Sequence, residues 1–324
     1  MTLRAAEAAL REMEGIEGQV TIVDNDSGDG SFQRLCDGAR AAGWLSAESL
    51  SGPRFALIAS PENGGFGAGN NVGIRAGLTD GRRADFIYIL NSDAFPDPGA
   101  IRALLTHLQT NPTTGLAGSY IHGPDGARHS TAFRFPSVLG EFEGAVCTGF
   151  VTRLLRNSVV SLPFPQTTQT VDWLAGASVM IRADVLDQIG LFDETFFLYF
   201  EETELCHRAR QAGWATDYVR DSEVTHIGSV STGMKDWTRT PTYWFQSRSH
   251  YFTKTHGRTY AALATLAQLT GGAIYRLRIA LQGKPRHDPP YFLRDLIRHA
   301  LGIKPRGSNP SGSVAPILPV KEPN

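Results

Sequence analysis

Three short apolar runs, each followed by polar or glycine-rich residues, constrain the fold of this 324-residue chain more than any other feature. They occupy residues 20–23, 55–59 and 86–90. Helical patterns separate them, and near-continuous apolar runs of this length are typical of strands buried on both faces. Strands that alternate with helices predict an α/β fold with a mainly parallel central sheet flanked by helices. Ligands bind such sheets beyond the carboxyl ends of the strands, so the residues after each run are candidates for a site.

The rest of the pattern divides the chain into a sheet-forming part and a helical part. Residues 1–235 hold the apolar runs and are expected to form one domain, in which 122–169 is an irregular insertion with a helix around 137–156. Residues 236–302 are expected to form a basic region of two or three helices. Residues 303–324 are rich in Pro, Gly and Ser and are expected to be disordered.

Local signals predict helices around the first strands. Apolar residues at helical spacing predict a helix over residues 3–14. Ser31 is expected to cap a helix that ends at Gly43, and Pro98 to open another helix behind Asp97.

Charge and cysteine content narrow the class of protein. The 31 basic and 32 acidic residues nearly cancel, so no global field favours nucleic acid as a partner. Cys36, Cys147 and Cys206 are few and widely spaced, which favours a reducing compartment over a disulfide framework or a cysteine zinc site. Residues 1–15 lack the apolar core of a signal peptide, and the run 259–275 is too short and polar for a transmembrane helix. We expect a soluble, cytoplasmic protein.

Residues 190–208 combine aromatic and acidic side chains and read Gly-Leu-Phe-Asp-Glu-Thr-Phe-Phe-Leu-Tyr-Phe-Glu-Glu-Thr-Glu-Leu-Cys-His-Arg. Glu201, Glu202 and Glu204 lie within four residues, and helical spacing beyond them places these acids at or near a helix N-terminus. Acids are favoured in any first helical turn because of the helix dipole. Burying carboxylates beside aromatic rings is costly without partners, which favours a catalytic or ligand-binding role. The residues alone leave both readings open.

The same stretch resembles the signature of family 2 glycosyltransferases, especially their rhamnosyltransferase-like branch, where a Gly-x-Phe-Asp-Glu run leads to an aromatic and a Glu-Asp pair. The pair reads Glu201–Glu202 here, and the resemblance extends over about residues 20–256. It implies the GT-A (nucleotide-diphosphosugar transferase) fold, with Glu201 and Glu202 as the catalytic pair. Glu202 takes the place of the base that deprotonates the acceptor hydroxyl in a single, inverting displacement. Glu201 and Glu204 are expected to bind acceptor hydroxyls, or Glu204 to pair with Arg208 one turn beyond it.

Two segments at strand ends resemble the donor-binding motifs of the family. Asp24 would contact the nucleotide base, with Ser27 as a weaker neighbour, although most such polar clusters only build turns. The run 63–71 resembles Asn-x-Gly-Phe-x-x-x-Asn-Asn, whose glycines admit a ligand close to the backbone ahead of a helix. The donor-binding residues expected in this run are Asn63, Gly65, Phe66, Asn70 and Asn71.

A metal site is implied by the segment that ends at Asp93, which resembles the Asn-x-Asp triplet of the family. Asp93 would bind the donor and, with His226 after the last expected strand, hold a divalent cation. The cation would be Mn²⁺ or Mg²⁺, and mixed oxygen and imidazole ligands suit Mn²⁺ better. From the residues alone, Asp93 equally fits a turn cap and His226 a structural histidine.

The acceptor side is expected near Trp173, Gly176 and Ala177, which resemble the acceptor segment of the family. An exposed Trp face suits stacking on a sugar ring, and the alternative is that Trp173 belongs to the core. Glu204 and Arg208 complete the expected acceptor-binding set.

The chain departs from the family at its start. Members begin with an apolar strand that ends near a Thr-Tyr-Asn-like motif, whereas this chain starts in the helix that should follow it. The first strand is therefore expected to be missing, either through a shortened start or through loss of a strand.

The C-terminal helices are unusually basic. Residues 239–306 contain twelve Lys or Arg but only Asp288 and Asp295 as acids, with aromatic residues among the bases. This composition fits a solvated cover over the acceptor cleft, or a peripheral contact of residues 240–302 with the cytoplasmic face of the inner membrane.

These expectations describe an inverting, metal-dependent glycosyltransferase of cell-surface polysaccharide synthesis. Its donor would be a nucleotide sugar, with rhamnose the leading candidate, and its acceptor a glycan or a lipid-linked glycan. The missing strand and the Glu201–Glu202 pair motivate an alternative, a non-catalytic homologue that binds sugar nucleotide or glycan. A nucleotidyltransferase is disfavoured because the N-terminal region lacks a basic glycine-rich triphosphate loop.

Overall fold

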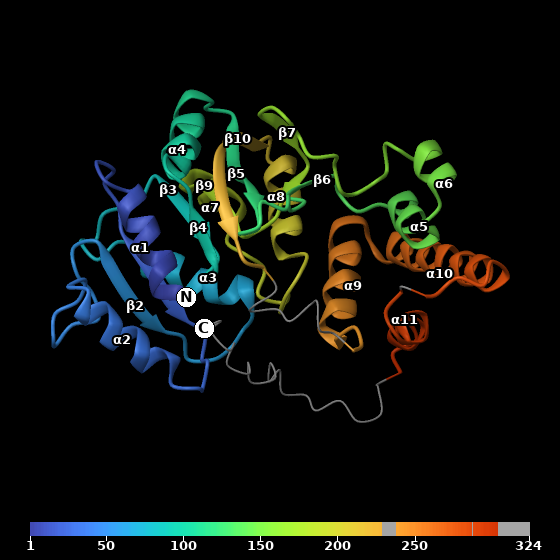
Figure 1. Cartoon of the computed structure of the whole chain (residues 1–324), viewed down its shortest axis with the longest axis horizontal. Coiled ribbons are helices and arrows are strands. Elements are labelled where there is room, and N and C mark those ends of the chain that lie inside the picture. Colours follow the sequence, from blue (N-terminus) through green and yellow to red (C-terminus); the bar gives the residue numbers. More distant parts are fainter. Residues whose placement is uncertain (229–237, 287, 304–324) are drawn as a thin grey trace.

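The computed structural model describes residues 1–228, 238–286 and 288–303, whose strands form one large and two small sheets (Figure 1). The expected disordered tail, 303–324, lies outside the described residues apart from its first position.

The N-terminal part is a series of helices and strands with a helix first. Its elements are α1 (Thr2–Glu12), β1 (Val20–Asp24), α2 (Ser31–Ala41), β2 (Phe55–Ala59), α3 (Phe66–Ala76) and β3 (Phe86–Leu90). All three apolar runs are confirmed as strands. β1 and β2 pair in parallel as a two-stranded sheet of their own, and no ladder between described residues joins them to β3.

The larger sheet is mixed, so the expected mainly parallel pairing is wrong although the α/β class is confirmed. Its members besides β3 are β4 (Ala94–Pro96), β5 (Thr114–His122), β7 (Gln169–Val171), β9 (Ser178–Arg182) and β10 (Ala215–His226). The strand order is β3-β9-β5-β10-β4, with β7 also on β10, and among these neighbouring pairs of described strands only β5–β10 is parallel. An apolar run reports that a strand is buried but not its direction, which depends on where the connecting segments cross.

Both faces of this sheet are covered by helices, which explains the near-continuous apolar runs. On β9, Val179 and Ile181 face the cluster that includes α7 (Ala183–Ile189) and α8 (Glu201–Gln211), while Met180 faces α4 (Ala100–Thr110). This alternation follows from the two-residue period of a strand. The layers fix α8 against the sheet and so position its acidic first turn.

Helices gather at one end of the molecule, away from β1 and β2 (Figure 1). They are α5 (Val138–Val146), α6 (Gly149–Leu154), α9 (Thr242–His256), α10 (Arg258–Leu281) and α11 (Phe292–Ala300). The single helix expected around 137–156 is two helices, separated at Cys147, which adopts a left-handed conformation with φ of 46°. None of the described helices combines the length and apolarity needed to cross a bilayer.

Two expected helix starts are corrected. Gly30, with φ of 80°, is the N-cap of α2, and Ser31 is already helical, so Ser31 is not the cap. α4 begins at Ala100 behind Gly99, two residues after Pro98, because Gly99 accepts the left-handed conformation that the turn requires.

Candidate active site

The candidate site is built where β1, β2 and β3 end. Asn25 follows β1 and donates its side-chain amide to the Gly65 carbonyl at 2.9 Å and to Asn63 Oδ1 at 3.1 Å. Asp24 is buried and accepts from the backbone amide and hydroxyl of Ser27, the latter at 2.7 Å. The structure therefore brings the expected base-binding turn together with the glycine-rich run, and gives Asp24 and Ser27 an internal hydrogen bond.

Gly65 brings the glycine-rich run directly against the aromatic loop before α8. The Phe66 amide donates to the Phe197 carbonyl at 3.0 Å, and a Cβ on Gly65 would lie 1.9 Å from that carbonyl oxygen. Gly65 also has a positive φ of 91°, so only glycine fits here. The run is mostly helix rather than loop, since α3 begins at Phe66.

Asn71 also connects the glycine-rich run to the loop before α8, through buried hydrogen bonds. It is fully buried, donates to the Phe192 carbonyl at 2.9 Å and accepts from the Phe192 amide at 3.1 Å. It also donates to Glu194 at 2.8 Å. These contacts favour a positioning role for Asn71 over direct donor contact. Asn70 is less buried and donates to the Phe66 carbonyl.

The acidic run occupies the first turn of α8, as the spacing predicts. Tyr199 and Phe200 precede it with φ of 70° and 71°, a left-handed conformation that is costly for aromatic residues. Such conformations persist only where surrounding contacts hold them and are common at functional sites. Glu201 and Glu202 follow directly, so the strained turn sets their direction.

Burial raises the pKa of both Glu201 and Glu202, and more strongly that of Glu201. Burial and the adjacent Glu202 charge raise the pKa of Glu201 well above its usual range, and burial also raises the pKa of Glu202. Glu201 is 2% exposed, and each residue has one buried carboxylate oxygen without a hydrogen-bond partner among the described residues. Adjacent buried carboxyls cannot both ionise cheaply. The charged form of Glu201 is opposed both by burial and by the neighbouring Glu202 charge.

Glu202 lies beside the expected acceptor segment. Its Oε1 is 3.8 Å from where a Cβ on Gly176 would lie, and that position is 3.2 Å from the Phe66 ring. The Ala177 carbonyl accepts from the Asn91 amide at 3.0 Å. A continuous set of contacts thus connects Glu202 to the strand end that carries Asp93.

Asp93 and His226 are adjacent, as the expected metal site requires. His226 Nε2 is 3.1 Å from Asp93 Oδ1 and 3.4 Å from the Asn91 amide nitrogen. Asp93 is 2% exposed, and its buried Oδ2 has no hydrogen-bond partner among the described residues. A buried carboxylate with a free oxygen beside an imidazole is a donor set that fits a divalent cation.

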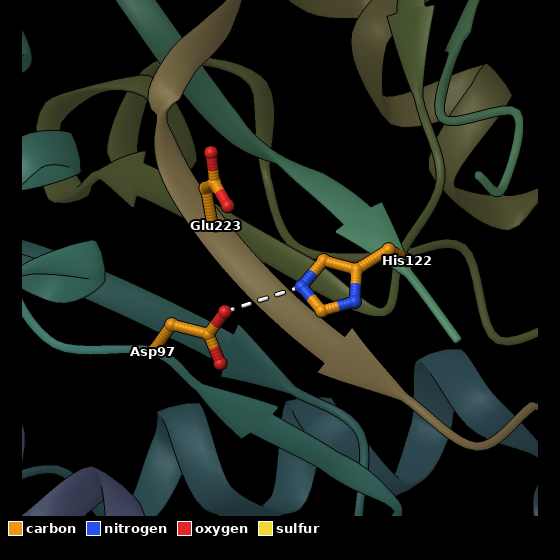
Figure 2. A group of neighbouring side chains, drawn as sticks. All are labelled: Asp97, His122 and Glu223. Carbon is orange, nitrogen blue, oxygen red and sulfur yellow. Dashed lines mark hydrogen bonds and ion pairs between the residues drawn. The ribbon is translucent and has the colours of Figure 1, made fainter. Parts of the chain in front are cut away.

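A second group with metal-ligand chemistry lies on β5 and β10 and just after β4 (Figure 2). Asp97, His122 and Glu223 bring ligand atoms within 4.8 Å of one another. His122 Nε2 is 3.1 Å from Asp97 Oδ2, its Nδ1 donates to the Gly123 carbonyl, and Arg220 pairs with Glu223. A protonated His122 satisfies these contacts without a metal, in keeping with its raised pKa, for which nearby hydrogen bonds and carboxylates outweigh burial.

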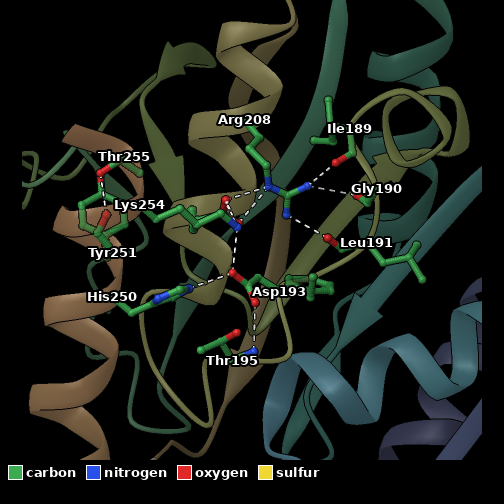
Figure 3. Close-up of polar contacts among 12 residues, drawn as sticks. Ile189, Gly190, Leu191, Asp193, Thr195, Arg208, His250, Tyr251, Lys254 and Thr255 are labelled. Atoms are coloured by element: carbon green, nitrogen blue, oxygen red, sulfur yellow. Dashed lines mark hydrogen bonds and ion pairs between the residues drawn. The ribbon is translucent and has the colours of Figure 1, made fainter. Parts of the chain in front are cut away.

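Two expected acceptor residues form a buried ion network instead (Figure 3). Glu204 is 1% exposed and accepts from Arg208 Nε at 2.7 and 2.9 Å and from Lys254 at 2.7 Å. Arg208 also donates to backbone carbonyls of the preceding loop, those of Ile189, Gly190 and Leu191. The alternative pairing of Glu204 with Arg208 is thus observed, and it leaves little of either side chain for an acceptor.

Trp173 also has internal partners. Its Nε1 donates to the Arg134 carbonyl at 2.9 Å, and its ring stacks on Phe133 at 4.1 Å between centroids. It packs against the main core cluster, so its contacts favour the core alternative over sugar stacking.

The ion network of Glu204 and Arg208 also includes residues that the sequence motifs did not mark as site residues. Asp193 accepts from His250 at 2.9 Å and from Lys254 at 2.7 Å, which ties the loop before α8 to α9. Burial alone would raise the pKa of Asp193, but the hydrogen bonds from His250 and Lys254 lower it well below its usual range. Asp193 belongs to the Gly-x-Phe-Asp-Glu run, and that motif could have marked it as a site residue. No local pattern marks His250 or Lys254.

Comparison with known proteins now identifies the family. The chain matches the family described as "Glycosyltransferase like family 2" over residues 45–250. It belongs to glycosyltransferase family 2. The N-acetylglucosaminyl-diphospho-decaprenol L-rhamnosyltransferase of Mycobacterium tuberculosis is 30% identical over 221 residues, 66% of this chain and 68% of that protein. Rhamnosyltransferase WbbL of Escherichia coli is 28% identical over 169 residues, 50% of this chain and 60% of that protein.

Solved structures agree on the fold of this family 2 glycosyltransferase. The mannosyltransferase PcManGT from Pyrobaculum calidifontis, in complex with GDP-Man and Mn²⁺, has a TM-score of 0.52 and 14% identity, covering 94% of this chain and 78% of that one. GalNAc-T7, with UDP, GalNAc and Mn²⁺, has a TM-score of 0.50 and 13% identity over 87% of this chain. The chain spans 48% of the length of that second protein. The GT-A fold and the family 2 membership predicted from the motifs are confirmed.

Proposed function

We propose that this glycosyltransferase moves a sugar from a nucleoside diphosphate to a hydroxyl group of a glycan or lipid-linked acceptor, with inversion at the anomeric carbon. The observation that carries the proposal is the partly buried Glu202 carboxyl at the start of α8, connected through Gly176, Ala177 and Asn91 to Asp93. A base and a polar strand end that receives the donor must lie on one side of the sheet for such a transfer.

Glu202 acts as the base in this proposal. As the acceptor oxygen forms its bond to the anomeric carbon, its proton passes to a Glu202 carboxylate oxygen. The bond from that carbon to the diphosphate breaks on the opposite face, and the nucleoside diphosphate leaves with the electron pair. Glu201 stays protonated, which keeps a second negative charge away from Glu202.

Asp93 and His226 would hold a divalent cation, which supplies charge neutralisation for the departing diphosphate when bound. The proposal of Mn²⁺ or Mg²⁺ rests on the paired donor set of this chain. Mn²⁺ in the PcManGT complex shows that one neighbour of the same fold carries it.

Rhamnose is the donor sugar that we favour, because relatives at 30% and 28% identity are named rhamnosyltransferases. The decaprenol in the name of the first relative supports a lipid-linked acceptor and a role in cell-surface polysaccharide synthesis. We propose that the protein works at the cytoplasmic face of the inner membrane, with residues 240–302 among those that contact it.

A donor screen tests this function. The purified chain is incubated with an N-acetylglucosaminyl-diphospho-lipid as acceptor and a panel of nucleoside diphosphate sugars, with and without Mn²⁺, and the released diphosphate is measured. We expect release with dTDP-rhamnose, increased by Mn²⁺, and a transferred sugar whose anomeric configuration is inverted by NMR. Donor binding without turnover for any sugar would instead favour the non-catalytic binding homologue.

A further inference from the structure

Large apolar side chains are exposed at one end of this molecule far more than elsewhere. Of the fifteen described large hydrophobic residues that are exposed, only Met1, Leu50 and Phe164 lie outside α5, α6, α10, α11 and their adjoining turns. The other twelve are Leu139, Phe150, Leu154, Leu263, Leu266, Ile274, Leu277, Leu281, Tyr291, Ile297, Leu301 and Ile303. Large exposed apolar side chains gathered on a few neighbouring helices are typical of an interaction site.

On α10 the exposed residues form a single stripe. At 100° per residue, Leu263, Leu266, Ile274, Leu277 and Leu281 fall within an arc of about 80° and along about 27 Å of helix. Their exposed fractions run from 43% to 81%.

The face of α10 away from the stripe is already occupied, because Gly272 and Ile279 are buried there and Gly272 packs against Leu293 of α11. The stripe is therefore the outer face of a helix with two apolar sides, and the core formed by residues 1–228, 238–286 and 288–303 does not cover it.

Charge distinguishes among the partners that such a face could meet. Residues 138–156 and 239–303 contain four acidic side chains, and each is buried or bonded: Glu141 to Arg248, Glu143 to Thr152, Asp288 to Arg276 and Arg286, and Asp295 to Arg239. Six basic side chains on or next to α6, α10 and α11 are exposed: Arg153, Arg156, Arg258, Lys284, Arg286 and Arg294. Helices that expose both leucines and cations, without exposed acids of their own, complement an anionic lipid surface.

A cavity opens within the same group of helices. It has a volume of about 250 Å³ and lies among α5, α10 and α11, with Ala145, Gly272, Phe292 and Leu293 in its lining. It is smaller than pockets that enclose drug-sized ligands, which begin near ~300 Å³, but it is mostly apolar. A segment of a lipid chain is the kind of group that such a space admits.

We propose that α5, α6, α10 and α11 form one lipid-facing surface, which holds the protein on an anionic bilayer with the α10 stripe at the boundary between headgroups and chains. This proposal rests on the proposed function and deepens it by naming an anionic bilayer as the partner of these helices. It extends the contact beyond residues 240–302 to include Leu139, Phe150 and Leu154.

Vesicle sedimentation tests this surface. The full chain is mixed with vesicles of phosphatidylcholine alone or with phosphatidylglycerol added. We expect binding to the anionic vesicles that weakens as salt is raised. The double substitution Leu266→Glu with Leu277→Glu should reduce the partition constant by about tenfold or more for each leucine.

A matched control introduces two glutamates at exposed apolar positions outside this surface. Leu50→Glu with Phe164→Glu replaces two large exposed side chains outside the surface and should leave vesicle binding unchanged. Thermal melting and vesicle-free release of nucleoside diphosphate should be equal in both double variants, which separates this proposal from the proposed function. The inference is overturned if the chain ignores anionic vesicles, if the control loses binding equally, or if light scattering shows a dimer that only Leu266→Glu with Leu277→Glu dissociates.

Discussion

Replacing Glu202 by glutamine should show whether Glu202, and not its neighbour Glu201, is the catalytic base. The amide keeps the size of the carboxyl but cannot take a proton from the acceptor. Glu202 borders a small cavity of about 10 Å³ together with apolar residues such as Phe192 and Leu205. A general base contributes roughly 10²- to 10⁴-fold to rate, so Glu202→Gln should reduce kcat by that factor. Donor affinity should change little.

Glu201→Gln is the matched control, since it makes the same chemical change one residue away. Burial and the Glu202 charge raise the pKa of Glu201 well above its usual range and so disfavour its charged form, which is why we expect a neutral amide to be tolerated there. We expect kcat to fall by no more than a few fold, with the melting temperature close to that of the unchanged protein.

The pH profile gives an independent readout. Burial raises the pKa of Glu202, so its charged, active form is lost as pH falls through a value above the usual carboxyl range. The rate should therefore rise with pH across that value, and Glu202→Gln should abolish this limb. Equal losses in Glu201→Gln and Glu202→Gln, or a preserved acid limb in Glu202→Gln, would refute the assignment of the base.

Three further substitutions probe the metal site, the ion network and the glycine contact. Asp93→Ala should abolish the Mn²⁺ stimulation of donor binding measured by calorimetry, while Asp97→Ala should retain it, and the reverse would move the cation to the neighbouring cluster. Arg208→Met removes one of the two cations that pair with buried Glu204 and should lower the free energy of unfolding in urea by ~1–3 kcal/mol; a loss near zero would contradict the network. Gly65→Ala requires a positive φ and a clash with a carbonyl, so it should cost more than ~1 kcal/mol of stability and weaken donor binding, and unchanged binding would count against this contact.

Local sequence patterns predicted the strands and the acidic helix because burial and capping act over a few residues. β2 and β3 have the bounds that the apolar runs predicted, and α8 begins at Glu201. Strand direction was not predictable in this way: β9 lies antiparallel between β3 and β5, and only the path of the connecting insertion decides that. Family resemblance supplied the GT-A fold that the mixed sheet realises.

The candidate site shows the same division between local and distant causes. The motifs identify Asp24, Asp93 and Glu202 as candidate site residues, and their roles in binding and catalysis stay predictions. Partners of Glu204 and Asp193 could not be read from spacing, because Lys254 lies 50 and 61 residues beyond them. Such pairs are set by how α9 packs, which no short pattern encodes.

The packing of α9 also connects the two proposals physically. Phe196, from the loop before α8, shares one buried cluster with Tyr251 and Phe252 of α9 and Ala264 of α10. Lys254 adds ion pairs to both sides of that loop. The exposed stripe of α10 is therefore held at a fixed height relative to the first turn of α8. If the stripe lies at the headgroup level, a lipid-linked acceptor meets Glu202 at a constant distance from the bilayer, so this cluster determines which part of a membrane-bound glycan reaches the base.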